Sequence, residues 1–264
     1  MNITAINRKP IFDAVRRMMG RGFTQNEVAR LDLAIEHAFE RSREEADMPK
    51  RGQQPRLGSL SERFESAGRG AGAVSSGRND PGGVSYGIYQ LASRTGTVGA
   101  FLRAEGQPWQ QAFGKSAPGT VRFSKVWRTA AGNDAARFEQ AQHQFIERTH
   151  YWPAVAAVFS ETGLDLDTRH RAVRDAAWSV AVQHGGAARI LNAAVRQADE
   201  NGARAELGYD RALLHAIYAH RSAYVLRVAE RSGPGAQRTL RSLTRSRYPQ
   251  ELKAALAMLD EPLS

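Results

Sequence analysis

The apolar positions after Leu91 recur at helical spacing along almost all of the remaining chain. Apolar residues at every third or fourth position give a helix one face that turns toward a core. The pattern predicts helices near 97–105, 134–149, 152–162, 168–183, 186–200, 210–230 and 249–259. This part of the chain is therefore expected to be almost entirely α-helical.

The first fifty residues carry a helical pattern of their own. Apolar residues spaced three or four apart within 10–19 predict a first helix, which Gly20 and Gly22 end. Thr24 is followed three residues later by Glu27, a capping box that opens a second helix. The polar stretch 43–57, which contains Pro and Gly, reads as a linker. We therefore expect an N-terminal helical hairpin in 1–50 and a second domain over 57–264.

A glycine-rich segment separates the two helical regions. Seven of the 24 glycines lie within residues 68–87, a density that excludes a helix there. β-branched and aromatic residues at 73–76 and 84–89 predict two short strands, joined by the turn-forming stretch 77–83. A short helix is expected to begin at Ser59, just before this segment. The predicted fold class is mainly α, with one small β-hairpin.

Composition removes several classes of function. The chain has no cysteine, which excludes disulfides, thiolate catalysis and Cys-ligated metal sites. No apolar run approaches the roughly 18 residues of a membrane span. The first residues carry scattered charges where a signal peptide would have an apolar core. We expect a protein made in the cytoplasm without a signal peptide.

Charge points to an anionic partner. The 37 basic and 27 acidic residues give a net charge of +10. Residues 211–247 hold eight arginines, no lysine and one acid, Glu230, which makes 8 − 1 = +7 for that segment alone. Nucleic acid, lipid head groups or an acidic wall polymer would each satisfy such a charge. A solvated arginine-rich surface without a specific role is the plainer alternative.

Two carboxylates, one just before the glycine-rich segment and one within it, have a spacing that suits glycoside hydrolysis. Glu65 stands near a predicted helix end beside Phe64, where burial would raise the pKa of a general acid. Asp80 follows 15 residues later in the predicted hairpin, and Ser85 could hold an attacking water. A solvated helix end and an Asx-turn explain the same two acids without catalysis.

Longer motifs connect these residues to a known superfamily. The stretch from Asp80 to Gly96, DPGGVSYGIYQLASRTG, resembles the hairpin of the chitosanase-like branch of the lysozyme superfamily. Phe64-Glu65-Ser66 followed by YGIYQL at 86–91 resembles the peptidoglycan muramidases of phage endolysins and type VI secretion effectors. The Glu-Ser and Gly-x-x-Gln-Leu elements are also similar to goose-type lysozymes and lytic transglycosylases. WSVAVQHG at 178–185 and IYAHR at 217–221 resemble later helices of the muramidases, so the resemblance covers about 57–260.

The resemblance implies a lysozyme-like catalytic domain over 57–264 that cuts the β-1,4 bond between N-acetylmuramic acid and N-acetylglucosamine. It makes Glu65 the general acid, Asp80 the base or charge stabiliser, and Ser85 a water-positioning group. It implies no cofactor and no metal. The residues that it places in the substrate cleft are Ser66, Tyr86, Tyr89, Gln90, Gln183 and His184.

Several alternatives remain open at this stage. If Asp80 points away from the cleft, a lytic transglycosylase acting on the same bond fits better. A phage endolysin is favoured over a type VI effector. A basic helical nucleic-acid-binding protein is the non-enzymatic rival. Asp165 and Asp167 could contribute to a calcium site or cap the helix that follows.

The expected partner is peptidoglycan in the periplasm, where the enzyme would act during host lysis. The positive charge then indicates attraction to the anionic wall, with a further contact of the arginine-rich C-terminal third to an anionic membrane surface. Residues 1–50 are expected to form an auxiliary helical module that binds the wall or packs against the lytic domain. No nucleic acid partner is expected, and the protein is expected to be a monomer.

Overall fold

The computed structural model describes two compact units, Met1–Pro55 and Arg56–Ser264. Most of the predicted linker 43–57 lies outside the described residues, as does the first predicted helix except Val15, which is helical. The residues that the structure describes are 15, 21, 23–25, 27, 28, 31, 57–60, 70–78 and 80–261.

In the first unit, the predicted capping box is present. The backbone N–H of Thr24 donates to the Glu27 carboxylate at 2.8 Å, and the backbone N–H of Glu27 donates to the Thr24 hydroxyl at 3.3 Å. Arg21 adds a two-pronged ion pair to the same carboxylate, with N–O distances of 2.6 and 2.9 Å. Hydrogen bonding from Arg21 and from the Thr24 backbone lowers the pKa of Glu27 to about 2. The box therefore opens a helix that includes the described residue Leu31.

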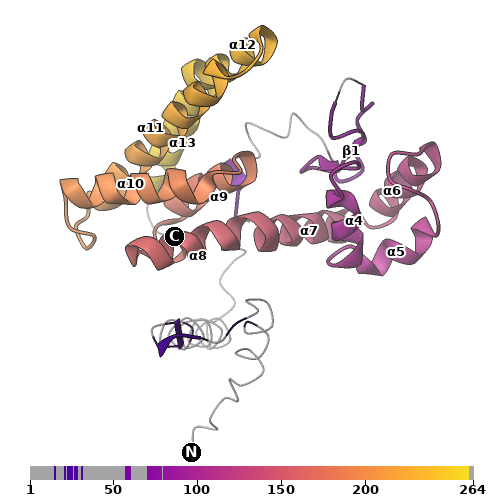
Figure 1. Cartoon of the computed structure of the whole chain (residues 1–264), viewed down its shortest axis with the longest axis horizontal. Coiled ribbons are helices and arrows are strands. Elements are labelled where there is room, and N and C mark those ends of the chain that lie inside the picture. Colours follow the sequence, from indigo (N-terminus) through magenta and orange to yellow (C-terminus); the bar gives the residue numbers. More distant parts are fainter. Residues whose placement is uncertain are drawn as a thin grey trace, which may run out of the picture. The chain divides into compact units, whose positions relative to one another are not determined.

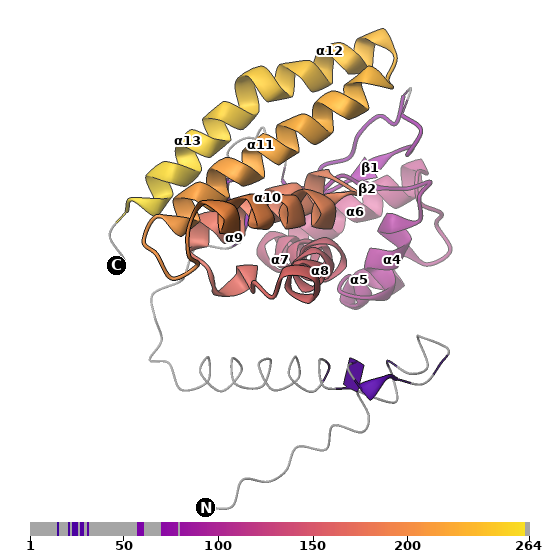
Figure 2. The ribbon, with the colours of Figure 1, turned by 60° about the vertical axis from the view of Figure 1, so that its left-hand side comes forward.

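The second unit is mainly helical (Figures 1 and 2). Two single π-helical turns, η1 and η3, each join two α-helices into one continuous rod. The described helices are α4 Thr97–Arg103, α5 Gln107–Phe113, α6 Val121–Asn133, α7 Ala135–Ile146, η1 Glu147–Tyr151, α8 Trp152–Thr162, the 3₁₀ turn η2 Leu166–Thr168, α9 Arg171–Gln183, α10 Ala187–Asn201, α11 Tyr209–Glu230, α12 Pro234–Ser242, η3 Leu243–Arg247 and α13 Tyr248–Leu259.

The described β structure is a two-stranded antiparallel sheet, β1 Ser85–Tyr86 and β2 Leu91–Ala92. On the other side of β1, Val74 forms a single antiparallel bridge with Tyr86. The strand predicted over 84–89 ends at Tyr86, because Gly87 at φ 74° begins a turn that Gln90 continues at φ 51°. The predicted fold class is confirmed as mainly α with a small antiparallel sheet.

The seven helices predicted from periodicity are all present, with ends shifted by a few residues. Helices α5, α6 and α12 were not predicted. Pro and Gly stand at or next to the start of α5 and α12, and α6 is short of strong helix formers. The Thr120 hydroxyl caps α6 by accepting the backbone N–H of Phe123 at 3.2 Å. A side-chain cap and tertiary burial, which periodicity does not report, therefore stabilise α6, whose Phe123 and Trp127 are buried.

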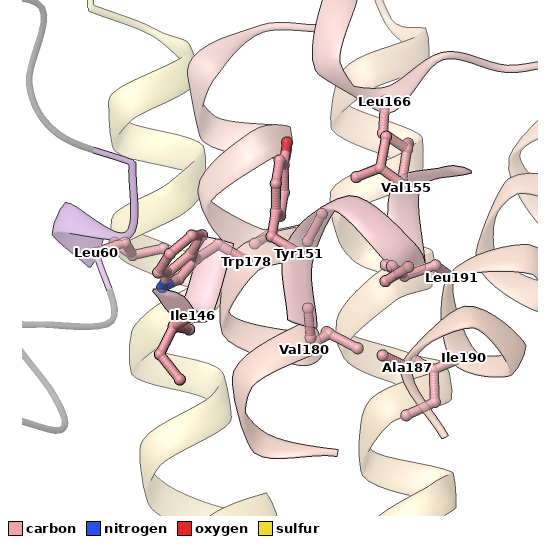
Figure 3. Close-up of a cluster of buried hydrophobic side chains, with 14 of the residues drawn as sticks. Leu60, Ile146, Tyr151, Val155, Leu166, Trp178, Val180, Ala187, Ile190 and Leu191 are labelled. Atoms are coloured by element: carbon pink, nitrogen blue, oxygen red, sulfur yellow. The ribbon is translucent and has the colours of Figure 1, made fainter. Parts of the chain in front are cut away.

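Helix α9 lies at the centre of the second unit. All but one of its residues from Ala172 to Ala181 are buried, and it packs against η1, η2, α10, α11 and α13. Figure 3 shows the side chains of Trp178 and Val180 among those of helices α7, α8 and α10 and of Leu60. A helix that is apolar on nearly every side belongs inside a core. Its few polar groups consequently need partners within the protein.

Arg221 of α11 supplies several of those partners. Its side chain has no exposed surface and forms an ion pair at 2.7 Å with Glu251 of α13, which is equally buried. The guanidinium also donates to the Ser179 hydroxyl at 2.8 Å and lies 4.2 Å over the ring of Tyr248. Arg247 contributes a second ion pair to Glu251 at 2.5 Å. This cluster joins α9, α11, η3 and α13.

We expect Glu251→Leu to lower the free energy of unfolding by about 3 to 5 kcal/mol, because it leaves the buried Arg221 without a counter-charge. Urea unfolding followed by circular dichroism measures the change. Asp260→Asn, which breaks the exposed pair between Asp260 and Arg211, is the matched control and should cost less than about 1 kcal/mol. Equal losses in the two variants would contradict the structural role of the buried pair.

Candidate functional site

Asp80 lies in the exposed loop that precedes β1. One carboxylate oxygen, Oδ1, accepts the backbone N–H of Gly82 at 2.7 Å, and the Asp80 carbonyl accepts the N–H of Gly83 at 2.9 Å. The Asx-turn considered from sequence is therefore present. The turn uses one carboxylate oxygen to shape the loop. The other oxygen forms no hydrogen bond with any residue that the structure describes. The turn is compatible with a chemical role of that second oxygen.

Ser85 and Tyr86 form β1 and, as neighbours on a strand, point to opposite faces of the sheet. Tyr86 has no exposed surface, and its hydroxyl bonds Ser124 and the N–H of Gly119, each at 3.0 Å. Tyr86, predicted as a cleft residue, therefore packs beneath the hairpin against Trp127. Ser85 is 6% exposed, and its backbone N–H donates to Ser75 at 2.8 Å.

The turn after β1 brings Tyr89 onto helix α7. The Tyr89 hydroxyl lies 2.6 Å from Nδ1 of His143, which is 5% exposed and stacks on Trp178 with ring centroids 4.5 Å apart. Tyr89 itself is half-buried, with its ring edge toward Trp178. The Gln90 amide turns back and donates to the Gly87 carbonyl at 2.8 Å. Tyr89 is thus fixed by two helices, while Gln90 stabilises the turn.

The side chain of Gln142 in α7 fixes the turn after β1 and the chain at Ala71 by hydrogen bonds. Its buried amide accepts the N–H of Ile88 at 3.1 Å and donates to the carbonyl of Ala71 at 3.1 Å. The indole N–H of Trp127 donates to the same carbonyl at 2.9 Å. A Cβ on Gly87 would lie 2.0 Å from the Gln142 amide oxygen, so this turn requires glycine at its positive φ. Ala71 and the turn after β1 are consequently held in place by α6 and α7.

A cavity of about 410 Å³ opens between the hairpin and the loop before α6. Serine, threonine and glycine residues and Arg94 are among the residues that line it. Gly77 and Gly83, which stand before and after Asp80 in its loop, both line the cavity, so the cavity lies beside the two ends of that loop. Its polar lining suits a hydroxyl-rich ligand better than an apolar one. The lining residues are Ser76, Gly77, Gly83, Val84, Ser93, Arg94, Pro118, Gly119 and Thr120.

The segment that leads toward Glu65 is anchored by Asp175 of α9. The Asp175 carboxylate accepts the N–H of Gly58 at 2.7 Å, the N–H of Leu60 at 2.9 Å and the Ser59 hydroxyl at 2.9 Å. Ser59 and Leu60 are helical, as predicted, so a buried carboxylate satisfies the first N–H groups of this helix. The predicted residues Glu65 and Ser66 lie outside the described residues.

Gln183 and His184 lie at the C-terminal end of α9, against α11 and α13. The Gln183 amide oxygen accepts from Arg221 and, at 3.3 Å, from the Tyr248 hydroxyl. Nε2 of His184 accepts from Arg221 at 3.3 Å, so the ring is neutral with its proton on Nδ1. Burial, together with the charges of Arg221 and Arg247, lowers the pKa of His184 to about 3. Both residues are thereby tied to the cluster around Arg221.

The structure distributes the predicted site residues over three places. Asp80 lies in the loop before β1 and Tyr89 in the turn after it, so the two residues lie on opposite sides of this strand along the chain. Gln183 and His184 belong to the interface of α9 with α11 and α13. His143 and Asp175 were not found from sequence. The signal for Asp175 was an acid among the buried positions of an apolar helix, whereas nothing local marked His143.

The acids considered for calcium have other partners. Oδ1 of Asp165 accepts the N–H of Asp167 at 3.0 Å and caps η2. Oδ1 of Asp167 accepts from the Tyr151 hydroxyl at 2.9 Å and from Arg174 at 3.0 Å. Among the residues that the structure describes, no group of three or more His, Asp or Glu side chains could hold a metal ion. Helix capping therefore accounts for Asp165.

The described parts of the second unit thus define a mainly helical protein with a short hairpin anchored on α7. A family model described as the C-terminal part of VgrG3-like spike proteins of the type VI secretion system matches residues 57–248. The chain belongs to this family. Over 135 residues it is 38% identical to the type VI secretion system spike protein VgrG3 of Vibrio cholerae serotype O1. That alignment covers 51% of this chain and 13% of the relative.

Membership in this family favours the type VI alternative and gives the predicted preference for an endolysin no support. As a separate finding, none of the helices in the described ranges has the length and apolar character needed to cross a membrane.

We expect Asp175→Ala to release the start of the helix at Ser59, because the N–H groups of Gly58 and Leu60 lose their acceptor. The loss of unfolding free energy should be about 1 to 3 kcal/mol. Hydrogen exchange followed by mass spectrometry should show faster exchange in a peptide that contains Gly58 and Leu60. The control Asp134→Ala removes the cap of α7 and should leave exchange of that peptide unchanged. Unchanged exchange in Asp175→Ala would contradict the anchoring role.

A second expectation concerns pH. The native pKa of His184 is about 3 and its ordinary value is 6.5, so between these values the unfolded chain binds the additional proton. The contribution of His184 to stability must then fall as pH drops below 6.5, by at most about 1.4 kcal/mol per pH unit. His184→Gln keeps an acceptor for Arg221 without titrating, so its unfolding free energy relative to wild type should rise by about 1 to 2 kcal/mol between pH 6.5 and 4.5. Parallel pH profiles of the two proteins would refute this expectation.

Proposed function

We propose that residues 57–264 form a peptidoglycan muramidase domain that acts in the periplasm and is delivered by type VI secretion. The observation that supports this proposal most strongly is membership in the VgrG3-like C-terminal family over 57–248, a range that includes both Glu65 and Asp80. The muramidase motifs of the sequence support the choice of chemistry. The secretion route is inferred from the family and from the name of the Vibrio relative.

In this proposal Glu65 protonates the oxygen of the β-1,4 bond as the sugar leaves. Glu65 comes five residues after Leu60 in the sequence, and Leu60 is held by Asp175 and by burial at 1% exposure. A general acid must be kept within hydrogen-bond reach of its target, so a rigid origin for this segment supports the role.

Asp80 is proposed to act with its second carboxylate oxygen, either as base toward water or as a charge that stabilises the oxocarbenium-like transition state. The Asx-turn supports this role because it limits the motion of the carboxylate. Ser85 is proposed to hold the attacking water. The proposed substrate contacts are Ser66, Tyr89, Gln90, Gln183 and His184. Tyr86 is buried, so its proposed role is to support β1 from beneath.

The cavity beside the Asp80 loop supports a carbohydrate substrate. Hydroxyls and one guanidinium are groups that bind sugar hydroxyls and carboxylates, and glycines let the polymer approach the backbone. Residues 1–50 are proposed to bind the wall and so raise the local concentration of the domain on its insoluble substrate.

The test is digestion of purified Gram-negative sacculi followed by mass spectrometry of the released muropeptides. Glu65→Gln should abolish release, because an amide cannot supply the proton. Reducing ends are the expected product of wild type. Anhydromuramic ends would identify a lytic transglycosylase instead, and intact glycan with cut peptides would exclude both.

Two substitutions at Asp80 separate chemistry from loop shape. Asp80→Asn keeps the acceptor for the Gly82 N–H and removes the charge, whereas Asp80→Ala removes both. If Asp80 is catalytic, both variants should lose at least about 100-fold in rate. An active Asp80→Asn with a weakened Asp80→Ala would show that the residue only shapes the turn, which a single-acid mechanism would accommodate.

A further inference from the structure

The eight arginines of residues 211–247 fall into two groups. Three of them, Arg211, Arg221 and Arg247, form ion pairs with carboxylates of α13 or the turn that ends it. The remaining five are exposed and form no ion pair with any residue that the structure describes. They are Arg227, Arg231, Arg238, Arg241 and Arg245.

These five arginines lie on one stretch, residues 222–247, which we call the basic arm. It comprises the end of α11, all of α12 and η3. Figures 1 and 2 show α11 lying alongside α12 and α13, with α12 at the end of the arm where the chain reverses. The arm contains a single acid, Glu230, so its charge is not neutralised locally.

Helical spacing gathers the charges into stripes. Arg227 and Arg231 are four residues apart, so they lie on one face at the end of α11. The arginines at 238, 241 and 245 are three and four residues apart along α12 and η3. No residue of α12 or η3 before Tyr248 is buried, so this rod lies on the surface.

Aliphatic side chains accompany the arginines on the exposed face. Leu226 and Val228, on either side of Arg227, are 40% and 38% exposed, while Val225 and Ala229 face the core. Exposed aliphatic groups beside guanidinium groups suit the boundary between lipid headgroups and acyl chains. A surface that stacks nucleic-acid bases would be expected to offer exposed aromatic rings, but the one aromatic residue of residues 222–247, Tyr224, is half-buried and packs against the ring of His184.

We propose that the basic arm docks on a membrane surface rich in anionic phospholipid. The guanidinium groups bind headgroup phosphates. Leu226 and Val228 project from opposite flanks of Arg227, so one of these two side chains at a time can enter the interfacial layer. This inference does not depend on the proposed muramidase activity, because it rests on the arm alone. It would keep the protein close to a membrane while residues elsewhere act.

The test is co-sedimentation of the full chain with vesicles of phosphatidylglycerol and phosphatidylcholine, or of phosphatidylcholine alone. Wild type should bind the anionic vesicles at physiological ionic strength and release them at roughly 1 M salt. The arm variant, in which the five arginines become glutamine, should bind at least about 100-fold more weakly, since each arginine near such a surface contributes about fivefold.

A matched variant removes the same charge from another region of the described surface. It replaces five exposed basic residues of α4, α6 and the loop between α5 and α6 by glutamine, and it should keep most of the vesicle binding. Those residues are Arg103, Lys115, Arg122, Lys125 and Arg128.

Three results would overturn the proposal. The first is equal loss of binding in the arm variant and the matched variant, which would indicate only total charge. The second is binding of wild type to neutral vesicles as strong as to anionic ones. The third is an arm variant that keeps vesicle binding but loses pelleting with sacculi or a DNA gel shift, which would assign the arm to the wall or to nucleic acid. Circular dichroism checks that each variant is folded. Two partial variants should each lose part of the vesicle binding. The first carries R227Q and R231Q, and the second carries R238Q, R241Q and R245Q.

Discussion

The burial of α9 is the constraint on which the rest of the second unit depends. A helix surrounded by other elements cannot leave polar side chains without partners, because each unsatisfied group costs about 1 to 3 kcal/mol. Asp175 accepts three hydrogen bonds from residues 58–60, and the side chains of Ser179 and Gln183 accept hydrogen bonds from Arg221. One helix therefore fixes both the beginning of the unit and the packing of α11 and α13.

The hairpin is held in the same way from α6 and α7. Gln142 and Trp127 bind the carbonyl of Ala71, while Tyr86 fills the space beneath β1. The β structure has only two residues in each named strand, too few to be stable by itself. The turn that carries Tyr89 is consequently held in place by helices α7 and α9.

Charge has two different uses in this protein. Arg221 is buried inside the fold, where Glu251 neutralises its charge and the side chains of Ser179 and Gln183 in α9 accept its hydrogen bonds. Arg227, Arg231, Arg238, Arg241 and Arg245 of the basic arm remain exposed at the surface. The sequence total of +7 for 211–247 mixes the two groups, and the structure separates them because only some of these arginines meet a carboxylate from another helix.

Local pattern was enough to determine the mainly α class, seven helices, the capping box at Thr24 and a strand at 85–86. These features depend on neighbours within a few residues, and their physics is therefore readable from a sequence. Local pattern did not find the partner strand at 91–92, and the predicted strand at 73–76 is reduced to the single bridge of Val74 with Tyr86. Tyr86 shows the limit, since its motif suggested a cleft residue whereas the fold buries it. His143, Asp175 and Arg221 acquire their roles from partners 30 to 117 residues away in the chain. Only the tertiary structure decides such pairings, because burial sets which polar groups must meet.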